Sequence, residues 1–111
     1  MAWQARHRYA RISSRKAKLL ADMIRGRDVQ DALNILKFMP HRAAVMISKV
    51  LTSAVANANE AEADVDKLYV HQARVDDGPT MKRWRLKDRW RTVMIRKRTS
   101  HITVVVEEEA K

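Results

Sequence analysis

The longest periodic pattern of the chain lies in residues 41–61, where apolar and small side chains recur three or four residues apart. This spacing places them on one face of a helix. Shorter stripes of the same kind predict helices over about residues 14–25 and 29–38. Gly26 follows the first as a C-terminal stop, and Asp28 precedes the second as its cap. We expect the three buried faces to be Ala17, Leu20, Ala21 and Ile24, widened by Leu19 and Met23; Ala32, Leu33, Ile35 and Leu36; and Ala43, Ile47, Val50, Leu51, Ala54 and Ala58.

After Asp64 the hydrophobic pattern changes from helical to alternating. β-branched residues and alternation predict strands over about residues 66–76 and 102–106, with the acidic residues that follow fraying. Residues 3–12 are too basic for a central strand, so we expect a short edge strand there, with Tyr9 and Ile12 pointing inward. The predicted fold class is α+β, with three helices packed on a small three-stranded antiparallel sheet.

Residues 79–99 hold little that a small core could bury. A structureless loop of this length is uncommon in a compact domain. We therefore interpret the segment as a long protruding β-hairpin, whose legs of about ten residues would extend roughly 30 Å. A lone two-stranded ribbon is only marginally stable in water, so it needs a surface to lie against. The alternative is a solvated loop whose tryptophans cover local apolar surface.

The chain of 111 residues has the size of a single domain, and its net charge of +10 is unevenly distributed. Residues 1–27 hold eight Lys and Arg against one Asp, and residues 80–100 hold nine against one Asp. Residues 28–79 hold five against eight Asp and Glu. Two basic blocks around a weakly acidic centre favour a nucleic-acid or membrane partner over a general solubility role.

The first basic block surrounds the start of the first predicted helix, where cations oppose the helix dipole unless a phosphate is bound. We interpret Ser13 as the helix cap rather than as a phosphate ligand. For the cations themselves, the alternative to phosphate contact is a solvated face. In the second block, Trp84 and Trp90 are interleaved with Lys and Arg. Rings that stack on bases, together with cations that contact phosphates, suit folded RNA.

The candidate RNA-binding residues combine both basic blocks with the two tryptophans and a polar pair that follows the arm. They are Arg6, Arg8, Arg11, Arg15, Lys16, Lys18, Lys82, Arg83, Trp84, Arg85, Lys87, Arg89, Trp90, Arg91, Arg96, Lys97, Arg98, Ser100 and His101.

The sequence shows no motif of catalysis or metal binding. It has no cysteine, its four histidines are scattered, and the common phosphate-loop, dinucleotide and nucleophile motifs are missing. We therefore expect no enzyme activity, no metal and no other cofactor. No apolar run approaches the roughly 20 residues of a membrane span, and no export signal is visible, so we expect a cytoplasmic protein without a membrane partner.

Four segments resemble the family of the bacterial ribosomal protein numbered twenty-two of the large subunit: RISSRKAKLLADMIRGRDVQDALNIL, AAVMISKVLTSAVANA, LYVHQARVDDGPTMKR and RKRTSHITVVV. The match is collinear from about Tyr9 to Val106. The resemblance implies a ribosomal protein that binds large-subunit (23S) rRNA early in assembly. It also implies a hairpin over about residues 80–98 that lines the polypeptide exit tunnel. Partners would be this rRNA, neighbouring large-subunit proteins and the nascent polypeptide near the hairpin tip.

The chain departs from the family pattern at two places. Ser14 stands where members often have proline at the start of the first helix. At the tip, members commonly show a run like Pro-Arg-Ala-Arg-Gly-Arg-Ala, whereas residues 86–92 read LKDRWRT. Trp90 thus replaces a small glycine and Asp88 adds an acid, which leaves the tip conformation open. We expect Trp90 either to narrow the tunnel or to stack on a base.

Two other functions fit part of the pattern. An architectural DNA-binding protein would place a basic ribbon in a groove, but such ribbons often carry an apolar wedge at the tip, and here the tip is mainly charged. A membrane-active protein would need a cationic helix with a strong apolar face, and the longest predicted helix carries few cations. Binding to folded rRNA in competition with duplex DNA would distinguish a ribosomal protein from an architectural DNA-binding protein.

Overall fold

The structure is a computed structural model that describes residues 2–109. The elements are β1 (Ala2–Ala10), α1 (Ser14–Ile24), α2 (Val29–Phe38), α3 (Arg42–Glu60), the 3₁₀ turn η1 (Val65–Lys67), β2 (Leu68–Asp77), β3 (Met81–Asp88), β4 (Arg91–Lys97) and β5 (Ser100–Glu108). Strands β1, β5 and β2 form an antiparallel sheet in that order, and β3 and β4 form a separate two-stranded sheet. The predicted α+β class and its protruding hairpin are confirmed. Met1, Ala110 and Lys111, at the ends of the predicted domain, lie outside the described residues.

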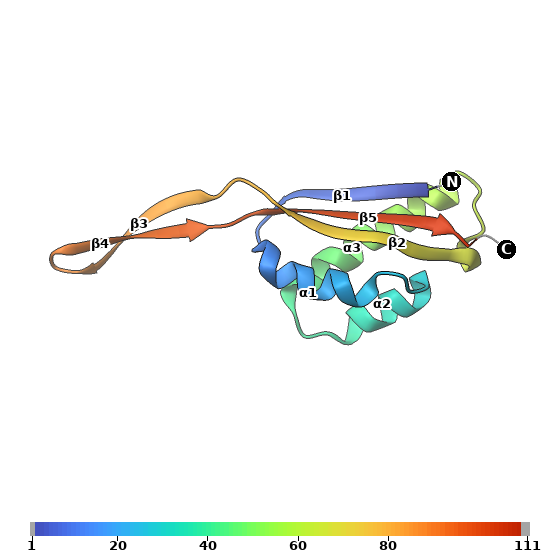
Figure 1. The fold of residues 1–111 in the computed structure, drawn as a ribbon, viewed down its shortest axis with the longest axis horizontal. Helices are drawn as coiled ribbons and strands as arrows, with labels where there is room; N and C mark the ends of the chain where they lie inside the picture. Colours follow the sequence, from blue (N-terminus) through green and yellow to red (C-terminus); the bar gives the residue numbers. More distant parts are fainter. Residues whose placement is uncertain (1, 110–111) are drawn as a thin grey trace.

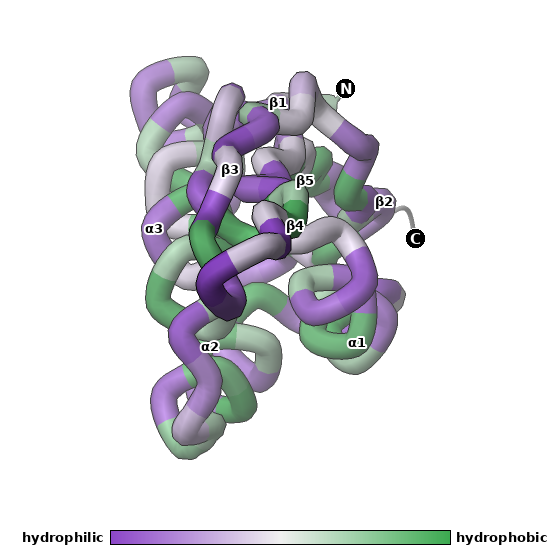
Figure 2. The backbone as a smooth tube through the Cα atoms, turned by 90° about the vertical axis from the view of Figure 1, so that its left-hand side faces the viewer, coloured by the Kyte–Doolittle hydropathy of each residue, from purple (hydrophilic) through white to green (hydrophobic). Residues whose placement is uncertain are grey.

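The three helices cover one face of the three-stranded sheet (Figure 1). Along the helices, hydrophilic and hydrophobic residues alternate, as amphipathic helices require (Figure 2). Every residue predicted for the inner face of the third helix is buried, and so are Ala17, Leu20, Ala21 and Ile24 of the first. Leu19 and Met23 are 66% and 38% exposed, so the prediction that they widen the stripe of the first helix is wrong. In α2, Ala32 and Leu36 are buried, but Leu33 and Ile35 are only half-buried, and Val29 is buried instead. The expectation for α2 was too broad because this helix lies at the margin of the body and buries a narrow stripe.

Strand β1 alternates between half-buried residues on the helix side and exposed arginines on the other face. The ladder to β5 shifts register between His7 and Ala10, and Tyr9 adopts a positive φ of 58° there. Tyr9 is 61% exposed, so the prediction that it points inward is wrong. The irregularity turns it outward, where its N–H donates to His101 Nδ1 at 3.1 Å. Ile12 is half-buried against the core, as predicted.

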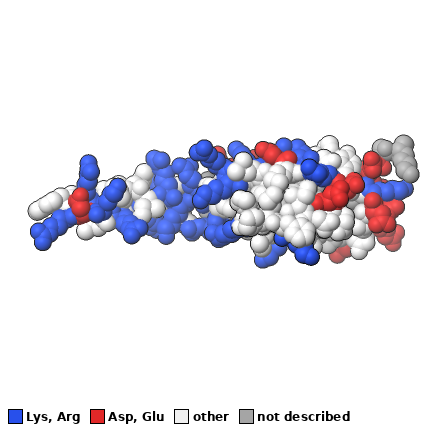
Figure 3. All heavy atoms as spheres, turned by 90° about the horizontal axis from the view of Figure 1, so that it is seen from below, with Lys and Arg blue, Asp and Glu red and all other residues white. Residues whose placement is uncertain are grey.

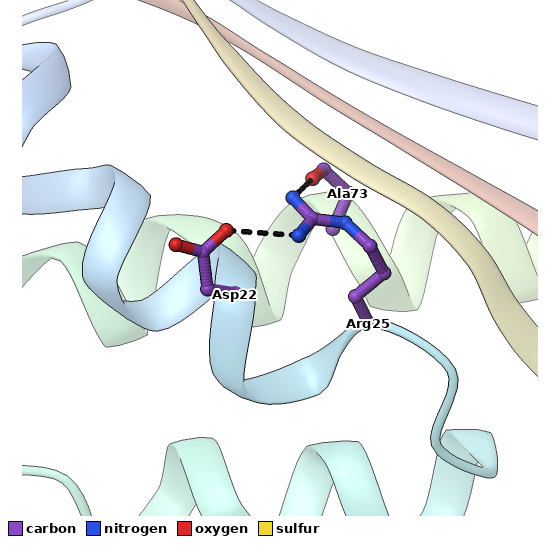
Figure 4. Close-up of polar contacts among 3 residues, drawn as sticks. All are labelled: Asp22, Arg25 and Ala73. Atoms are coloured by element: carbon purple, nitrogen blue, oxygen red, sulfur yellow. Dashed lines mark hydrogen bonds and ion pairs between the residues drawn. The ribbon is translucent and has the colours of Figure 1, made fainter.

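The end of α1 explains why two cations of the first basic block serve the body itself. Gly26 has a φ of 81° and donates its N–H to Val70 O at 2.8 Å. Arg25 pairs with Asp22 at 2.9 Å and donates to the backbone oxygen of Ala73 at 2.5 Å (Figure 4). Arg27 likewise donates to a backbone oxygen of α1, at 2.8 Å. These contacts satisfy carbonyl groups at the helix C-terminus and on β2.

The acidic end of β5 does not fray, contrary to expectation. β5 continues to Glu108, and Glu107 lies opposite both Ala2 of β1 and Tyr69 of β2. The Tyr69 hydroxyl donates to Glu107 Oε2 at 3.0 Å. The acidic residues are therefore ordered by two neighbouring strands, which the local sequence does not reveal.

The hairpin leaves the body through two short connections, residues 78–80 and 98–99. Gly78 donates its N–H to Thr99 O at 2.9 Å, and the Thr99 hydroxyl donates to Pro79 O at 2.6 Å. A Cβ on Gly78 would lie 2.6 Å from Thr99 Oγ1, so the two connections approach too closely for a larger residue. The Ser14 hydroxyl donates to Asp77, which ties the start of α1 to the same place.

Candidate nucleic-acid interface

The hairpin extends away from the body and gives the molecule dimensions of 65 × 24 × 18 Å. Its register runs from Met81 opposite Lys97 to Asp88 opposite Arg91. Every side chain from Lys82 to Thr92 is exposed. The ribbon therefore has its own backbone pairing but lacks a body surface on which its side chains could pack.

Each face of the ribbon mixes cations with apolar groups. On one face, Lys82 lies opposite Arg96 and Trp84 lies opposite Met94. The other face places Arg83 and Arg85 beside β-branched side chains of β4. Trp84 is 72% exposed, although an aromatic ring of this size is normally covered. Such a surface suits a partner that offers both phosphates and flat, apolar bases.

The tip turns through Arg89 and Trp90 without a glycine. Asp88 Oδ1 accepts the N–H of Trp90 at 3.0 Å, which is the side-chain contact that an aspartate provides in a turn. This contact supports the turn at a tip that contains no glycine. Trp90 itself is 91% exposed and so is free to contact a partner.

A basic cavity of about 490 Å³ lies where the hairpin joins the body. Its lining consists of Arg11, Ile12, Ser13, Lys16, Arg42, Arg96 and Arg98. Ser13 is the N-cap residue of α1, but its side chain makes no capping hydrogen bond, so the interpretation of its hydroxyl as a cap is wrong. Arg42 was not among the candidate residues because it is distant in sequence from both basic blocks.

A second, smaller recess of about 210 Å³ lies on the open face of the three-stranded sheet. Arg6 and Arg74 lie on either side of Thr103, and both are in register with it. Arg8 and His101 also line the recess, together with Asp76, whose carboxylate pairs with Arg74 Nε at 3.3 Å. Arg74 was also missed, although the alternation of β2 places it opposite to the buried Ala73 and so on this open face.

The remaining candidates divide between the surface and the interior. Arg15 and Lys18 are exposed on α1 and line neither recess. Ser100 is fully buried, and its hydroxyl donates to Ile12 O at 3.0 Å. It is therefore not available to RNA, and the prediction that it contacts RNA is wrong. Ser100 is the first residue of β5, and its hydrogen bond to Ile12 holds the start of this strand against the chain that follows β1.

Basic side chains cover the hairpin and the adjoining end of the body, whereas acidic side chains gather at the far end (Figure 3). Between residues 2 and 109, no three His, Asp or Glu side chains come together in a way that could hold a metal ion. In the same range, no helix is both long and apolar enough to cross a membrane. A small α+β body with a projecting cationic ribbon is typical of proteins that insert an arm into nucleic acid.

The comparison with known families agrees with this class. Residues 5–107 match the family of ribosomal protein L22p/L17e, and the chain belongs to this family. It is thus a structural protein of the large ribosomal subunit, and the resemblance found in the sequence is confirmed.

Proposed function

We propose that the protein binds large-subunit rRNA through the hairpin and the adjoining end of the body. In this role it supports early assembly of the subunit, and the hairpin tip lines the polypeptide exit tunnel. The observation that carries the proposal is the ribbon itself, because it is exposed, cationic and unsupported by the body. We assign the protein a structural role in the cytoplasmic ribosome, without a reaction of its own.

The electrostatics of the ribbon favour a polyanionic partner. Lys82 lies directly opposite Arg96, and like charges in such a pair destabilise a two-stranded sheet. The segment 80–100 contains nine cations and only Asp88 as an acid. Phosphate groups would remove this repulsion, so binding and ordering of the ribbon reinforce each other.

Folded RNA suits the ribbon better than duplex DNA does. Trp84, Leu86 and Trp90 are all at least 70% exposed, and they lie among arginines. Splayed bases, which folded RNA offers and a regular duplex does not, can cover such groups. A DNA-binding architectural ribbon would instead insert an apolar wedge, whereas Trp90 stands between Arg89 and Arg91.

The binding proposal is tested by measuring affinity for an rRNA fragment and for duplex DNA at matched salt. With about six to eight phosphate contacts, log affinity should fall against log salt with a slope near −5 or steeper. Replacing Arg83, Arg85 and Arg89 with alanine should make the slope shallower by about 2 units. The matched control replaces Lys37, Lys49 and Lys67, which removes the same charge from the body. Equal affinity for both nucleic acids, or a slope near −1, would contradict the proposal.

Three further experiments address the ribosomal setting. The protein should remain with large subunits through a high-salt wash, and reconstitution without it should stall at an early particle. For the tunnel, a photoreactive amino acid at Trp90 should crosslink to nascent polypeptide in translating ribosomes. Crosslinks to rRNA alone would remove the tunnel-lining part of the proposal and leave rRNA binding in place.

A further inference from the structure

The basic cavity at the root of the hairpin collects charge from both parts of the molecule. Arg11, Lys16 and Arg42 come from the body, and Arg96 and Arg98 come from the arm. No carboxylate lines the cavity. Among residues 2–109, none of these five cations takes part in an ion pair. The five like charges therefore face one another without an acidic ion-pair partner among the described residues, although the Asp77 carboxylate lies at the start of α1, where it accepts a hydrogen bond from the Ser14 hydroxyl.

The backbone next to the cavity adds positive potential. α1 begins at Ser14 and α3 begins at Arg42, and both helix starts adjoin the lining residues. Neither Ser13 nor His41 caps its helix through the side chain, and neither first turn contains an acid. The free N–H groups at the start of α3 thus strengthen a site that the five cations already define, whereas the Asp77 carboxylate at Ser14 offsets part of the positive potential of α1.

The joint between arm and body is narrow. Between the end of one sheet and the start of the other, the chain is held across the gap by the Gly78–Thr99 and Thr99–Pro79 hydrogen bonds. Repulsion between the cations of the body and those of the arm acts directly on this joint. A bound anion would replace this repulsion by attraction, because it attracts the cations of the body and those of the arm at once.

We propose that this cavity is a phosphate site that fixes the direction of the arm relative to the body. One phosphate group is held between Arg42 of the body and Arg98 of the arm, with the other three cations around it. Arginine suits this role because its planar group can donate two hydrogen bonds to one phosphate. The identity of the natural ligand, an rRNA phosphodiester, rests on the proposed function; the phosphate site itself does not.

The experiment uses the full chain and inorganic pyrophosphate as the probe. Because the sequence contains no cysteine, Gln30→Cys on α2 and Thr92→Cys on β4 place two spin labels at exposed positions of body and arm. We expect pyrophosphate to narrow the distribution of distances between the labels. Arg42→Gln and Arg98→Gln should each weaken pyrophosphate binding by about tenfold, the loss expected for one charge-assisted contact.

The matched control is Lys49→Gln, which removes a charge from the same helix as Arg42 but outside the cavity. It should leave both affinity and distance distribution unchanged. The inference is overturned if pyrophosphate leaves the distribution broad, or if Lys49→Gln acts like Arg42→Gln. Arg42 and Lys49 are both exposed, so neither change should affect folding.

A parallel titration with an rRNA fragment separates this inference from the proposed function. Arg42→Gln should make the salt slope shallower by about 0.7, one contact's share. Normal rRNA binding without any effect of Arg42 would sink the joint site and leave the proposed function standing. Narrowing by pyrophosphate without a preference for rRNA over DNA would support the phosphate site and overturn the proposed function.

Discussion

The Ser14 hydroxyl donates a hydrogen bond to Asp77 Oδ1, which joins the first residue of α1 to the last residue of β2. A proline at position 14, which the resemblance noted in the sequence implies for other members, would carry no hydroxyl and could not make this contact. Ser14→Ala should lower the free energy of unfolding by about 0.5–1.5 kcal/mol. Urea titration measures the loss. A double-mutant cycle with Asp77→Ala should return a coupling energy, and strict additivity would show that the contact contributes nothing.

Ser14→Pro should be less destabilising than Ser14→Ala. Proline is favoured at the first helical position, and Ser13 already has the extended conformation, φ −72° and ψ 143°, that a residue before proline prefers. The substitution loses the hydrogen bond to Asp77. It also lowers the conformational entropy of the unfolded chain, which stabilises the folded protein by about 0.4–1 kcal/mol. The comparison uses the same urea titration; a larger loss for proline than for alanine would contradict this account.

Gly78→Ala should destabilise the root of the hairpin. The added methyl would meet Thr99 Oγ1 at 2.6 Å, and the backbone carbonyl carbon of Thr99 and His101 Nε2 each at 3.3 Å, so the connections must move apart. We expect a loss of about 1–3 kcal/mol, as for other overpacked sites. Hydrogen exchange of the Gly78–Thr99 region and urea titration both report the effect.

The control for Gly78 is the double variant with Thr99→Ala, which removes the nearest clashing atom and should recover part of the loss. Gly26→Ala offers a contrast. Its Cβ would meet nothing within 4 Å, so only the φ of 81° opposes the change. That strain costs about 1–2 kcal/mol. If Thr99→Ala gave no recovery in the Gly78→Ala background, the clash would not be the cause.

Trp90→Ala should weaken rRNA binding without affecting the body. Its ring is 91% exposed, so its removal costs no packing in the free protein. If it stacks on a base, affinity should fall by the equivalent of about 1–3 kcal/mol, measured by direct titration with an rRNA fragment. Trp90→Phe should retain most of this affinity. An unchanged affinity for Trp90→Ala would exclude stacking and leave tunnel narrowing as the remaining role.

Tyr69 should ionise at a higher pH than an ordinary tyrosine. Its hydrogen bond to Glu107, then desolvation and the charges of Glu107 and Glu109, raises the pKa of Tyr69 above 10.0. Because the folded pKa lies above the unfolded one, the stability from this pair is complete below about pH 10 and is lost as the pH rises through the folded value. Tyr9→Phe leaves Tyr69 as the single tyrosine, so phenolate absorbance follows it directly. Glu107→Gln should move the midpoint back toward 10.0, and no movement would show another cause.

The sequence predicts the parts of this molecule that local patterns determine. The stripe from Ala43 to Ala58 specifies α3, and the density of cations in residues 80–98 indicates a ribbon that projects from the body. Contacts between distant segments are different. The register shift that turns Tyr9 outward depends on β5, and the ordering of Glu107 depends on Tyr69.

The candidate site shows the same division. Charge blocks identify the hairpin cations and those before α1, because these cations are dense in sequence. Arg42 and Arg74 are isolated in sequence and join the basic surface only through folding. Ser100 fails for the opposite reason: it lies next to a basic run, but the fold buries it at the start of β5.

The order β1–β5–β2 places the strand that comes latest in the sequence at the centre of the sheet. During synthesis, β1 and β2 therefore have no strand to pair with until residues 100–108 have been added. The helices can form early from short-range contacts, but closure of the sheet joins residues about a whole chain length apart, which makes it a slow and late step. Folding of the body during translation is thereby delayed to the final stage of synthesis. Chains that end before β5 cannot form the three-stranded sheet.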